Sequence, residues 1–552
     1  MPQIESPVEP TSSISEARIS AGEQLFETWR KRLGAILALP AFVLTYLLCS
    51  GLRPEGRTLA AILTTVTVLW ISETIPLPVT ALLGTVLCVV LGAVPAESGK
   101  SPATMVLAHF GDPIIFVFIG GFMIARAMTV HGLDRRIALG VLSIPSVGSS
   151  PMKTMVGLGL VTAVISMWVS NSATTAMMLP IALGILRALH DVRVARGLAQ
   201  GSMETSHWPF ATGMMLMVAF GASIGGIGTP VGSPPNLIGI GLIRSALGID
   251  IGFFRWMTLA VPLLLVMGVT LFTVLYLLHP PDQDADRTAS NREGRTASIT
   301  QGISTTDPGT HLLDYISSER RKLGSWTRGQ VNTVIGFSVA VTLWVMPGIL
   351  QLPWFAGIGW GRWMGAHLPE SVVALGAAIL LFLLPVNLSR WEFTLSWPEA
   401  VKIDWGTILL FGGGLALGSL MFKTGVAEAL GNTLTGLLGV TSLWGLTGLS
   451  IALAIVISEA ASNTASANMI IPVVIAIAQA AGINPLPPAL GACLGASFGF
   501  MLPVSTPPNA IVYGSGLVAL PKMVRAGVLF DIAGFFIIWG SLYLLHGVLG
   551  LL

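Results

Sequence analysis

Apolar runs of similar length, separated by short polar connections, cover most of this 552-residue chain. A helix needs about 20 apolar residues to cross the roughly 30 Å hydrocarbon core of a bilayer. Eleven runs come near that length or exceed it: 33–50, 58–72, 77–94, 113–130, 211–243, 259–278, 331–349, 371–387, 405–422, 487–520 and 525–548. The pattern therefore predicts an all-α polytopic membrane protein with eleven transmembrane helices.

Two further apolar segments, 152–190 and 444–481, are too long for one span and are divided near their middle by polar residues. Each arm has about 14 to 18 residues, or roughly 21 to 27 Å of helix, which is shorter than the hydrocarbon core. Re-entrant hairpins that do not cross the membrane fit best. The remaining spans after the first then form two repeats of five, and an odd number of crossings inverts one repeat relative to the other.

The polar residues that divide the two hairpins repeat one motif 292 positions apart. The first copy reads Ser-Asn-Ser-Ala-Thr at 170–174, and the second reads Ser-Asn-Thr-Ala-Ser at 462–466. Uncompensated polar groups cost several kcal/mol in hydrocarbon, so such clusters face a partner or a cavity. Two copies in halves of similar hydropathy predict a duplicated transporter with one small-solute site between its repeats.

A second polar element follows each hairpin, at 232–236 (Gly-Ser-Pro-Pro-Asn) and at 505–509 (Ser-Thr-Pro-Pro-Asn). Successive prolines remove backbone donors and break a helix, so 211–243 and 487–520 should each be two half-helices joined by an unwound turn. The freed carbonyl oxygens suit a small dehydrated cation, and the N-termini of half-helices offer N–H groups to an anion. One arrangement can therefore bind both kinds of ion.

Glycine pairs repeat at the same offset, in Phe-Ile-Gly-Gly-Phe at 118–122 and Leu-Phe-Gly-Gly-Gly at 410–414. Adjacent glycines allow close helix packing, which accounts for them without any functional role. Helix–helix hydrogen bonding likewise accounts for a single membrane hydroxyl. The repetition of all these elements in the same halves of the chain is what favours a functional site.

The charge distribution predicts an orientation in the membrane. Residues 1–32 form a polar tail that should be disordered and cytoplasmic, because the basic residues 30–32 directly precede the first transmembrane helix, 33–57. Repeat 1 then covers 58–278 and repeat 2 covers 331–552. The charged linker 279–330 should be cytoplasmic and, after eleven crossings, the C-terminus external.

Composition excludes several other classes of protein. The chain is 53% hydrophobic and 10% charged, and its 29 Lys and Arg against 27 Asp and Glu give no basic field for nucleic acid. The three cysteines have no metal-binding spacing and predict no disulfide. No Walker or zinc-protease motif occurs, and the histidines are dispersed, so an ATP-driven pump and a lipid-modifying enzyme both lack their residues. We expect no enzymatic activity and no organic cofactor.

Four charged residues lie in or near apolar segments: Arg126, Asp404, Lys423 and Glu459. Intramembrane charges are functional candidates by default, although Arg126 and Lys423 are near span ends and can extend to the interface. Glu459 lies inside a hairpin arm beside Ser458. A role near the second cation site and a role without any cation are both open for it.

The paired Ser-Asn-Ser/Thr motifs and Pro-Pro-Asn turns resemble those of the divalent anion:sodium symporter family, the sodium-coupled dicarboxylate, citrate and sulfate carriers. The resemblance covers roughly 58–548. It implies two sodium sites, the first formed by Ser166, Ser170, Asn171 and Gly232 and the second by Ser458, Ser462, Asn463 and Ser505. It also implies that the substrate carboxylates meet Asn171, Ser172, Asn463, Thr464, Thr506 and Pro507.

The resemblance further implies a homodimer in the inner or plasma membrane that moves its substrate as an elevator. Ser172 stands where the family's usual residue is Thr, which leaves anion binding intact but bears on substrate choice, since one methyl group is worth about 1–3 kcal/mol. The expected function is sodium-coupled import of a C4-dicarboxylate such as succinate. A sodium-independent exchanger and a sulfate carrier are the alternatives, and the absence of Lys and Arg from both motifs and both turns favours sodium.

Overall fold

The structure, a computed structural model, describes residues 21–97, 99–148, 150–195, 208–280, 308–352, 354–355, 359–439 and 442–549. These residues are mostly helical, and they include one small antiparallel pair of strands, β1 (Pro385–Asn387) and β2 (Glu392–Phe393). The helical content follows from the long apolar runs, because a backbone surrounded by lipid has to satisfy its hydrogen bonds within each segment.

Each predicted span of the first half corresponds to a helix or a pair of helices. They are α1 (Ala21–Leu48), α2 (Pro54–Ser72), α3 (Leu77–Val90), α5 (Pro113–Val130), α10 (Pro209–Ile227) with α11 (Pro234–Leu247), and α12 (Phe253–Leu278). Shorter elements connect them: α4 (Pro102–Leu107), η1 (Ala108–Gly111), α6 (Leu133–Leu142) and α7 (Pro145–Gly148).

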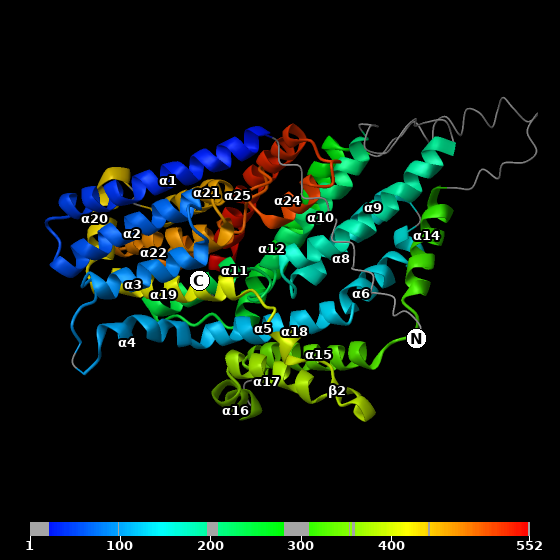
Figure 1. Ribbon diagram of the computed structural model, residues 1–552, viewed down its shortest axis with the longest axis horizontal. Helices are drawn as coiled ribbons and strands as arrows, with labels where there is room; N and C mark the ends of the chain where they lie inside the picture. Colours follow the sequence, from blue (N-terminus) through cyan, green and yellow to red (C-terminus); the bar gives the residue numbers. More distant parts are fainter. Residues whose placement is uncertain are drawn as a thin grey trace, which may run out of the picture.

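The second half repeats this order of elements. Its long helices are α15 (Arg328–Leu350), α17 (Glu370–Leu383), α19 (Trp405–Lys423), α23 (Leu486–Gly495) with α24 (Pro507–Tyr513), and α25 (Leu520–Leu549). Its shorter elements are α14 (Pro308–Lys322), α16 (Gly359–His367), η3 (Leu388–Arg390), α18 (Trp397–Ala400) and α20 (Val426–Leu438). In Figure 1 the body is elongated, with α1, α2 and α20 at one end and α6, α9 and α14 at the other.

Both predicted hairpins are helix–turn–helix units, formed by α8 (Pro151–Ser166) with α9 (Asn171–Ala195) and by α21 (Leu443–Ala460) with α22 (Asn463–Ala480). Helix α9 has 25 residues and continues beyond the predicted end at 190. At about 37 Å it is long enough to span a bilayer, so the argument from short arms does not hold for this helix. The apolar pattern weakens near residue 190, but helical backbone hydrogen bonding continues past it.

Ten helices within the described residues are long and apolar enough to cross a membrane. That set includes the hairpin helices α9, α21 and α22, and it leaves out the shorter apolar helices α3, α8, α17 and α23. The predicted count of eleven spans instead leaves out both hairpins and counts each pair of half-helices as one span. The protein is thus a multi-pass helical membrane protein, while the eleven spans and their inverted orientation remain predictions.

The two halves pack across each other through paired contacts. Helix α5 packs against α17 and α3 packs against α19, while α9 contacts α24 and α11 contacts α22. Glycines allow the first two of these contacts to be close. A Cβ atom on Gly120 would lie 2.4 Å from the carbonyl carbon of Ala374, and one on Gly413 would lie 2.7 Å from the Cβ of Ala81. The repeated glycine pairs therefore serve helix packing.

The structure differs from the sequence prediction at both charged segments. Helix α1 begins at Ala21, inside the segment predicted to be a disordered tail, and Arg30 pairs with Glu73 at 3.0 Å. The predicted linker contains α14, whose Leu312 and Ile316 are fully buried. Charged residues surround this short apolar stripe and mask it in the average hydropathy. Residues 1–20 and 281–307 lie outside the described part of the chain.

Candidate functional site

Unwound segments separate the half-helices at the positions that the two proline pairs predict. Residues 228–233 lie between α10 and α11, and residues 496–506 lie between α23 and α24. Proline occupies the first turn of both α11 and α24, where its missing N–H removes no helical hydrogen bond. The prediction of broken helices is confirmed.

One asparagine holds each break in shape. Asn236 Nδ2 donates to the carbonyl oxygens of Gly226 at 2.8 Å and Thr229 at 2.7 Å. In the second half, Asn509 Nδ2 donates to those of Gly499 at 2.9 Å and Leu502 at 3.0 Å. Both amides reach back by the same sequence separations, so the Pro-Pro-Asn turns form one repeated structure, here called the asparagine clasp.

The tip of the first hairpin faces the first break. Ser166 Oγ donates to Asn171 Oδ1 at 2.8 Å, and a Cβ on Gly226 would lie 2.3 Å from that same oxygen. A Cβ on Gly232 would meet the carbonyl oxygens of Gly226 at 2.6 Å and Met167 at 2.7 Å. The structure therefore brings Ser166, Asn171 and Gly232 together, and Gly226 and Gly232 pack so closely there that a Cβ atom would not fit.

The second hairpin tip repeats this geometry. Ser458 Oγ donates to Asn463 Oδ1 and to the Ala496 carbonyl oxygen, each at 2.8 Å. Asn463 Nδ2 donates to the Ser497 carbonyl at 3.2 Å, and Ser505 Oγ reaches the Glu459 carbonyl at 3.0 Å. The predicted residues Ser458, Asn463 and Ser505 thus also form one cluster.

Two of the predicted ligands act as helix caps. Ser170 Oγ accepts from the Ala173 N–H at 3.4 Å, and Ser462 Oγ accepts from the Ala465 N–H at 3.4 Å. Each hydroxyl therefore satisfies one free donor at the start of α9 or α22. In this geometry these two side chains support the tips, and their backbone carbonyl oxygens belong to the first helical turn.

Both clusters contain buried oxygen acceptors without a donor. Asn236 and Asn509 are fully buried, and neither Oδ1 atom has a hydrogen-bond partner within the described part of the chain. Carbonyl, amide and hydroxyl oxygens are the ligands that hard cations prefer. A buried polar group without a partner is costly, and a bound sodium ion would remove that cost.

The predicted substrate residues lie on helices that pack across the two halves. Asn171 and Ser172 begin α9, which contacts α24, the helix that starts at Pro507. Asn463 and Thr464 begin α22, which contacts α11. Helix N-termini carry partial positive charge and free N–H groups, so α9 and α22 present an environment suited to carboxylates.

Glu459 is the best-connected charged residue of this region, and it is 4% exposed. Its Oε1 accepts from the N–H groups of Phe500 at 2.5 Å and Met501 at 2.8 Å, and its Oε2 accepts from Ser505 Oγ at 2.7 Å. Glu459 therefore ties the second hairpin tip to the second break.

Two kinds of residue in this region are not marked by the sequence motifs. The bracing role of Asn236 and Asn509 depends on backbone carbonyls that no pattern marks, although their repetition was visible. Asp531 is only 6% exposed within α25, and an acid inside an apolar run is a signal that the sequence does contain.

The other charged candidates form structural contacts. Arg126 pairs with Glu399 at 2.5 Å, and Asp404 caps α19 by accepting from the Thr407 N–H at 3.0 Å. Lys423 pairs with Glu97 at 2.8 Å and, by donating a hydrogen bond, holds the pKa of that exposed carboxyl below its ordinary value. None of these contacts places Arg126, Asp404 or Lys423 in either cluster.

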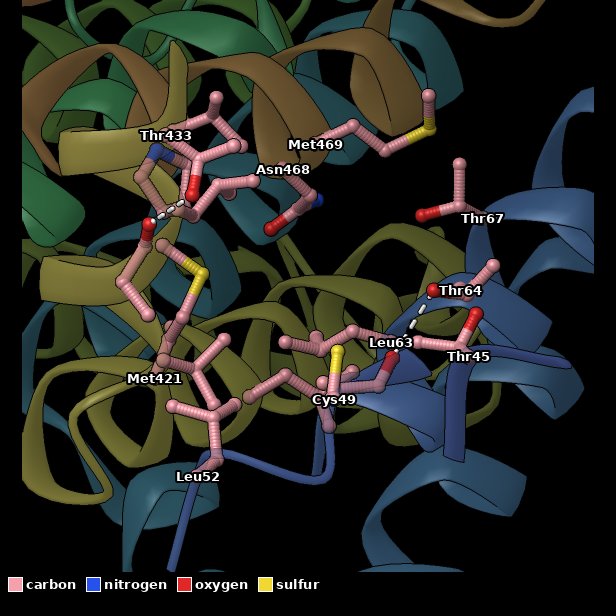
Figure 2. Close-up of a pocket in the computed structure, with 18 of the residues that line it drawn as sticks. Thr45, Cys49, Leu52, Leu63, Thr64, Thr67, Met421, Thr433, Asn468 and Met469 are labelled. Carbon is pink, nitrogen blue, oxygen red and sulfur yellow. Dashed lines mark hydrogen bonds between the residues drawn. The ribbon is translucent and has the colours of Figure 1, made fainter. Parts of the chain in front are cut away.

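A separate cavity of about 650 Å³ is lined by residues of α1, α2, α19, α20 and α22. Figure 2 shows Asn468 pointing into it between Met421 and Thr67. Its walls are largely apolar and contain none of the predicted sodium or substrate residues. The cavity is therefore distinct from the two clusters at the hairpin tips.

A multi-pass helical protein with polar groups gathered at paired helix breaks belongs to the class of membrane transport proteins. The chain matches the family described as the sodium:sulfate symporter transmembrane region over residues 27–552. It belongs to this family, the divalent anion:sodium symporters.

Relatives of the chain carry transporter names. It is 31% identical over 499 residues to the sodium-dependent dicarboxylate transporter SdcS of Staphylococcus saprophyticus, covering 90% of this chain and 87% of the relative. It is 32% identical over 506 residues to an uncharacterized transporter of Haemophilus influenzae, covering 91% and 95% of the two chains. Among solved structures, the YdaH transporter of Alcanivorax borkumensis has a similar fold, with a TM-score of 0.52, 12% identity, and coverage of 87% of this chain and 98% of that one.

Proposed function

We propose that this protein is a sodium-coupled symporter that uses the inward sodium gradient to import a small divalent anion. The observation that carries this proposal is the paired geometry of the hairpin tips and breaks. In each half a serine–asparagine contact of 2.8 Å lies beside backbone carbonyls freed from helical hydrogen bonding. Two such sites suit two sodium ions, each close to the start of a helix that can receive a carboxylate.

The first sodium ion would bind near Ser166, Asn171 and the Gly232 carbonyl, with Ser170 supporting the tip. The second would bind near Ser458, Asn463 and the Ser505 carbonyl, with Ser462 in the supporting position. Between them the substrate would contact Ser172, Thr464, Thr506 and Pro507 as well as both asparagines. A dianion in a low-dielectric site needs cations beside it, so sodium and substrate should each raise the affinity for the other.

The proposed substrate is a C4-dicarboxylate such as succinate. The relatives named sodium-dependent dicarboxylate transporters support this choice. Sulfate is the second candidate, which the name of the matching family favours. Ser172, in place of the usual Thr of the family, enlarges the pocket by one methyl group, and such a difference alters discrimination by about 1–3 kcal/mol.

A sodium-independent exchanger of the same fold is the alternative mechanism. An exchanger would have to balance the charge of the dianion without sodium, for which basic side chains are the obvious means. No Lys or Arg occurs in either Ser-Asn motif or either Pro-Pro-Asn turn. This composition favours sodium coupling.

We further propose a homodimer in the inner or plasma membrane, with the N-terminus cytoplasmic and the C-terminus external. Each protomer would have eleven spans in two inverted repeats after the first helix. The hairpins and broken helices would move together as an elevator against the remaining helices. The packing of α8 on α10, and of α21 on α23, supports treating these elements as one unit.

Uptake by purified protein in proteoliposomes tests the function. Labelled succinate and labelled sulfate are supplied outside, with an inward gradient of sodium or with potassium or choline in its place. We expect succinate to accumulate only with sodium. Counterflow of succinate that proceeds equally in potassium or choline would identify the exchanger, and preferential uptake of sulfate would change the substrate but keep the coupling.

A further inference from the structure

The cavity lined by α2 and α22 lies outside the two clusters at the hairpin tips and differs from them in chemistry. Its volume of about 650 Å³ is within the range of about 300–1,000 Å³ that is typical of small-molecule sites. Its walls are largely apolar, and none of the described residues that line it carries a charge. A dianion would lose its hydration there without an opposite charge to compensate, so the cavity is not a second site for the substrate.

One buried amide provides a specific polar contact in this cavity. Asn468 is 5% exposed and points into the cavity between Met421 and Thr67, as Figure 2 shows. Its Nδ2 donates to the Thr464 carbonyl oxygen at 2.9 Å, whereas its Oδ1 has no donor within the described part of the chain. A buried acceptor without a donor is costly. The ligand that fits here therefore brings a hydroxyl or N–H group to Asn468.

This amide belongs to the second half of the chain alone. Asn468 lies over Gly414, where a Cβ atom would be 1.7 Å from its Oδ1. The residues 292 positions earlier are Ala176 and Phe122, so the first half has neither the amide nor the glycine that makes room for it. The clusters at the hairpin tips are repeated, and this arrangement is not. The cavity is therefore an addition to one half and stands apart from the duplicated site.

The cavity reaches the lipid-facing surface at the end of α1. Leu48, the last residue of this helix, lines the cavity and is 73% exposed. Leu44 and Leu47, on the preceding turn, are exposed as well. In a membrane-spanning helix such leucines face the acyl chains of the bilayer. A ligand therefore enters from the membrane, and its apolar part lies along these leucines.

We propose that this cavity binds a neutral amphiphile from the membrane, of the class of long-chain alcohols. The hydroxyl donates to Asn468 Oδ1, and the chain lies against the apolar walls. The ligand connects α2 with α22, the helix that begins at the predicted substrate residue Asn463. The binding site goes beyond the proposed function, but its effect on transport rests on the proposed elevator. An occupied cavity holds the second hairpin against α2 and stops uptake, even when succinate is saturating.

Photolabelling in proteoliposomes tests the site independently of transport. The probe is dodecan-1-ol with a diazirine on its chain, and labelled peptides are identified by mass spectrometry. The competitors are dodecan-1-ol and its methyl ether, which keeps the chain and the oxygen but has no hydrogen to donate. We expect label on the cavity residues of α2 and α22, and we expect the alcohol to remove it and the ether to leave it.

Two variants and a matched control are labelled beside the wild type. Asn468→Leu removes the acceptor and keeps the size of the side chain, so it should lower labelling of the cavity about fivefold, the effect of one hydrogen bond. Thr67→Trp fills the cavity and should abolish labelling while Asn468 is still present. Asn432→Leu makes the same exchange at an exposed position of α20 outside the cavity and should be labelled like wild type.

Uptake of labelled succinate is measured in the same proteoliposomes. Dodecan-1-ol should lower the sodium-driven rate in wild type and in Asn432→Leu, and saturating succinate should not restore it. Asn468→Leu should need about fivefold more alcohol for the same inhibition.

Each other outcome overturns a stated part of this inference. Label confined to lipid-facing residues of α1, or equal labelling of the cavity in wild type and Asn468→Leu, overturns the site. Labelling of the cavity without inhibition overturns the effect on transport and keeps the site. Wild type that shows no sodium-driven uptake before alcohol is added overturns the proposed function, and labelling still decides the site. If Asn468→Leu cannot be recovered, Thr67→Trp and the contrast between alcohol and ether decide it.

Discussion

At the scale of single residues, four asparagine side chains form hydrogen bonds that hold the hairpin tips and the helix breaks in shape. Asn236 and Asn509 bind backbone carbonyls through their amide nitrogens, while Asn171 and Asn463 accept from serine hydroxyls. The first pair shapes the breaks, and the second pair connects the hairpin tips to them. Asparagine suits both positions because its side-chain amide has a nitrogen that donates hydrogen bonds and an oxygen that accepts them.

We expect Asn171→Ala and Asn463→Ala each to lower sodium-driven uptake of succinate at least tenfold. Each change removes an amide that no neighbour replaces. Asn171→Ala also takes the Asn171 acceptor from the buried Ser166 hydroxyl, which costs about 1–3 kcal/mol, whereas Ser458 keeps the Ala496 carbonyl as an acceptor after Asn463→Ala. Initial rates in proteoliposomes, normalised to reconstituted protein, measure the effect. Asn432→Ala, at an exposed position of α20, is the control and should transport normally. Normal uptake by both tip variants would remove the motifs from the site.

Stability should depend on pH through His279, which follows α12. Burial lowers the pKa of His279 from 6.5 to about 4, with Lys522 and Arg525 adding to the effect. The folded protein therefore keeps this imidazole neutral, and its stabilising contribution is present above pH 6.5 and is lost as the pH falls toward 4. The loss amounts to at most about 3 kcal/mol.

The measurement is the unfolding temperature of the purified protein in detergent at about pH 7.5 and about pH 5. Wild type should lose stability at the lower pH, and His279→Gln should lose less. An equal loss in both proteins would show that other groups dominate the acid sensitivity.

At the scale of elements, close helix contacts depend on glycine. We expect Gly120→Ala to lower the free energy of unfolding by about 1–3 kcal/mol, because its Cβ would lie 2.5 Å from the Ala374 carbonyl oxygen and would force α5 away from α17. Gly376→Ala in α17 is the matched control. Its Cβ would meet nothing within 4 Å, so the change should be neutral or slightly stabilising. Thermal unfolding of the two variants in detergent compares them, and equal unfolding temperatures would contradict the tight contact.

The helices themselves could be predicted because lipid imposes a simple rule on apolar length, and the breaks could be predicted because consecutive prolines have one effect on a helix. The contacts of individual residues could not be predicted. Leu312 and Ile316 are buried only because α14 meets other helices, and Asn236 braces a break only because carbonyls of α10 lie within reach. Such roles depend on contacts in three dimensions that hydropathy does not encode.

At the scale of the whole molecule, the orientation in the membrane is the main prediction. The linker should be cytoplasmic and the C-terminus external, since eleven crossings follow a basic N-terminal flank. A cysteine added after Leu552 should react with an impermeant maleimide applied outside intact cells. Cys49, which is only half-buried, is replaced by Ser in the background. Labelling only after the cytoplasmic side is opened would contradict the span count and the inverted repeat with it.

The asparagine clasps have a consequence for the half of a transport cycle in which nothing is carried. After releasing its cargo, a symporter has to return empty, and a site whose backbone depended on ions would lose its shape at that moment. Here each break is held by hydrogen bonds from an asparagine side-chain amide to backbone carbonyls of the same half of the chain. In the proposed symport cycle these hydrogen bonds would keep the site folded after the cargo leaves, so the return step would need no refolding.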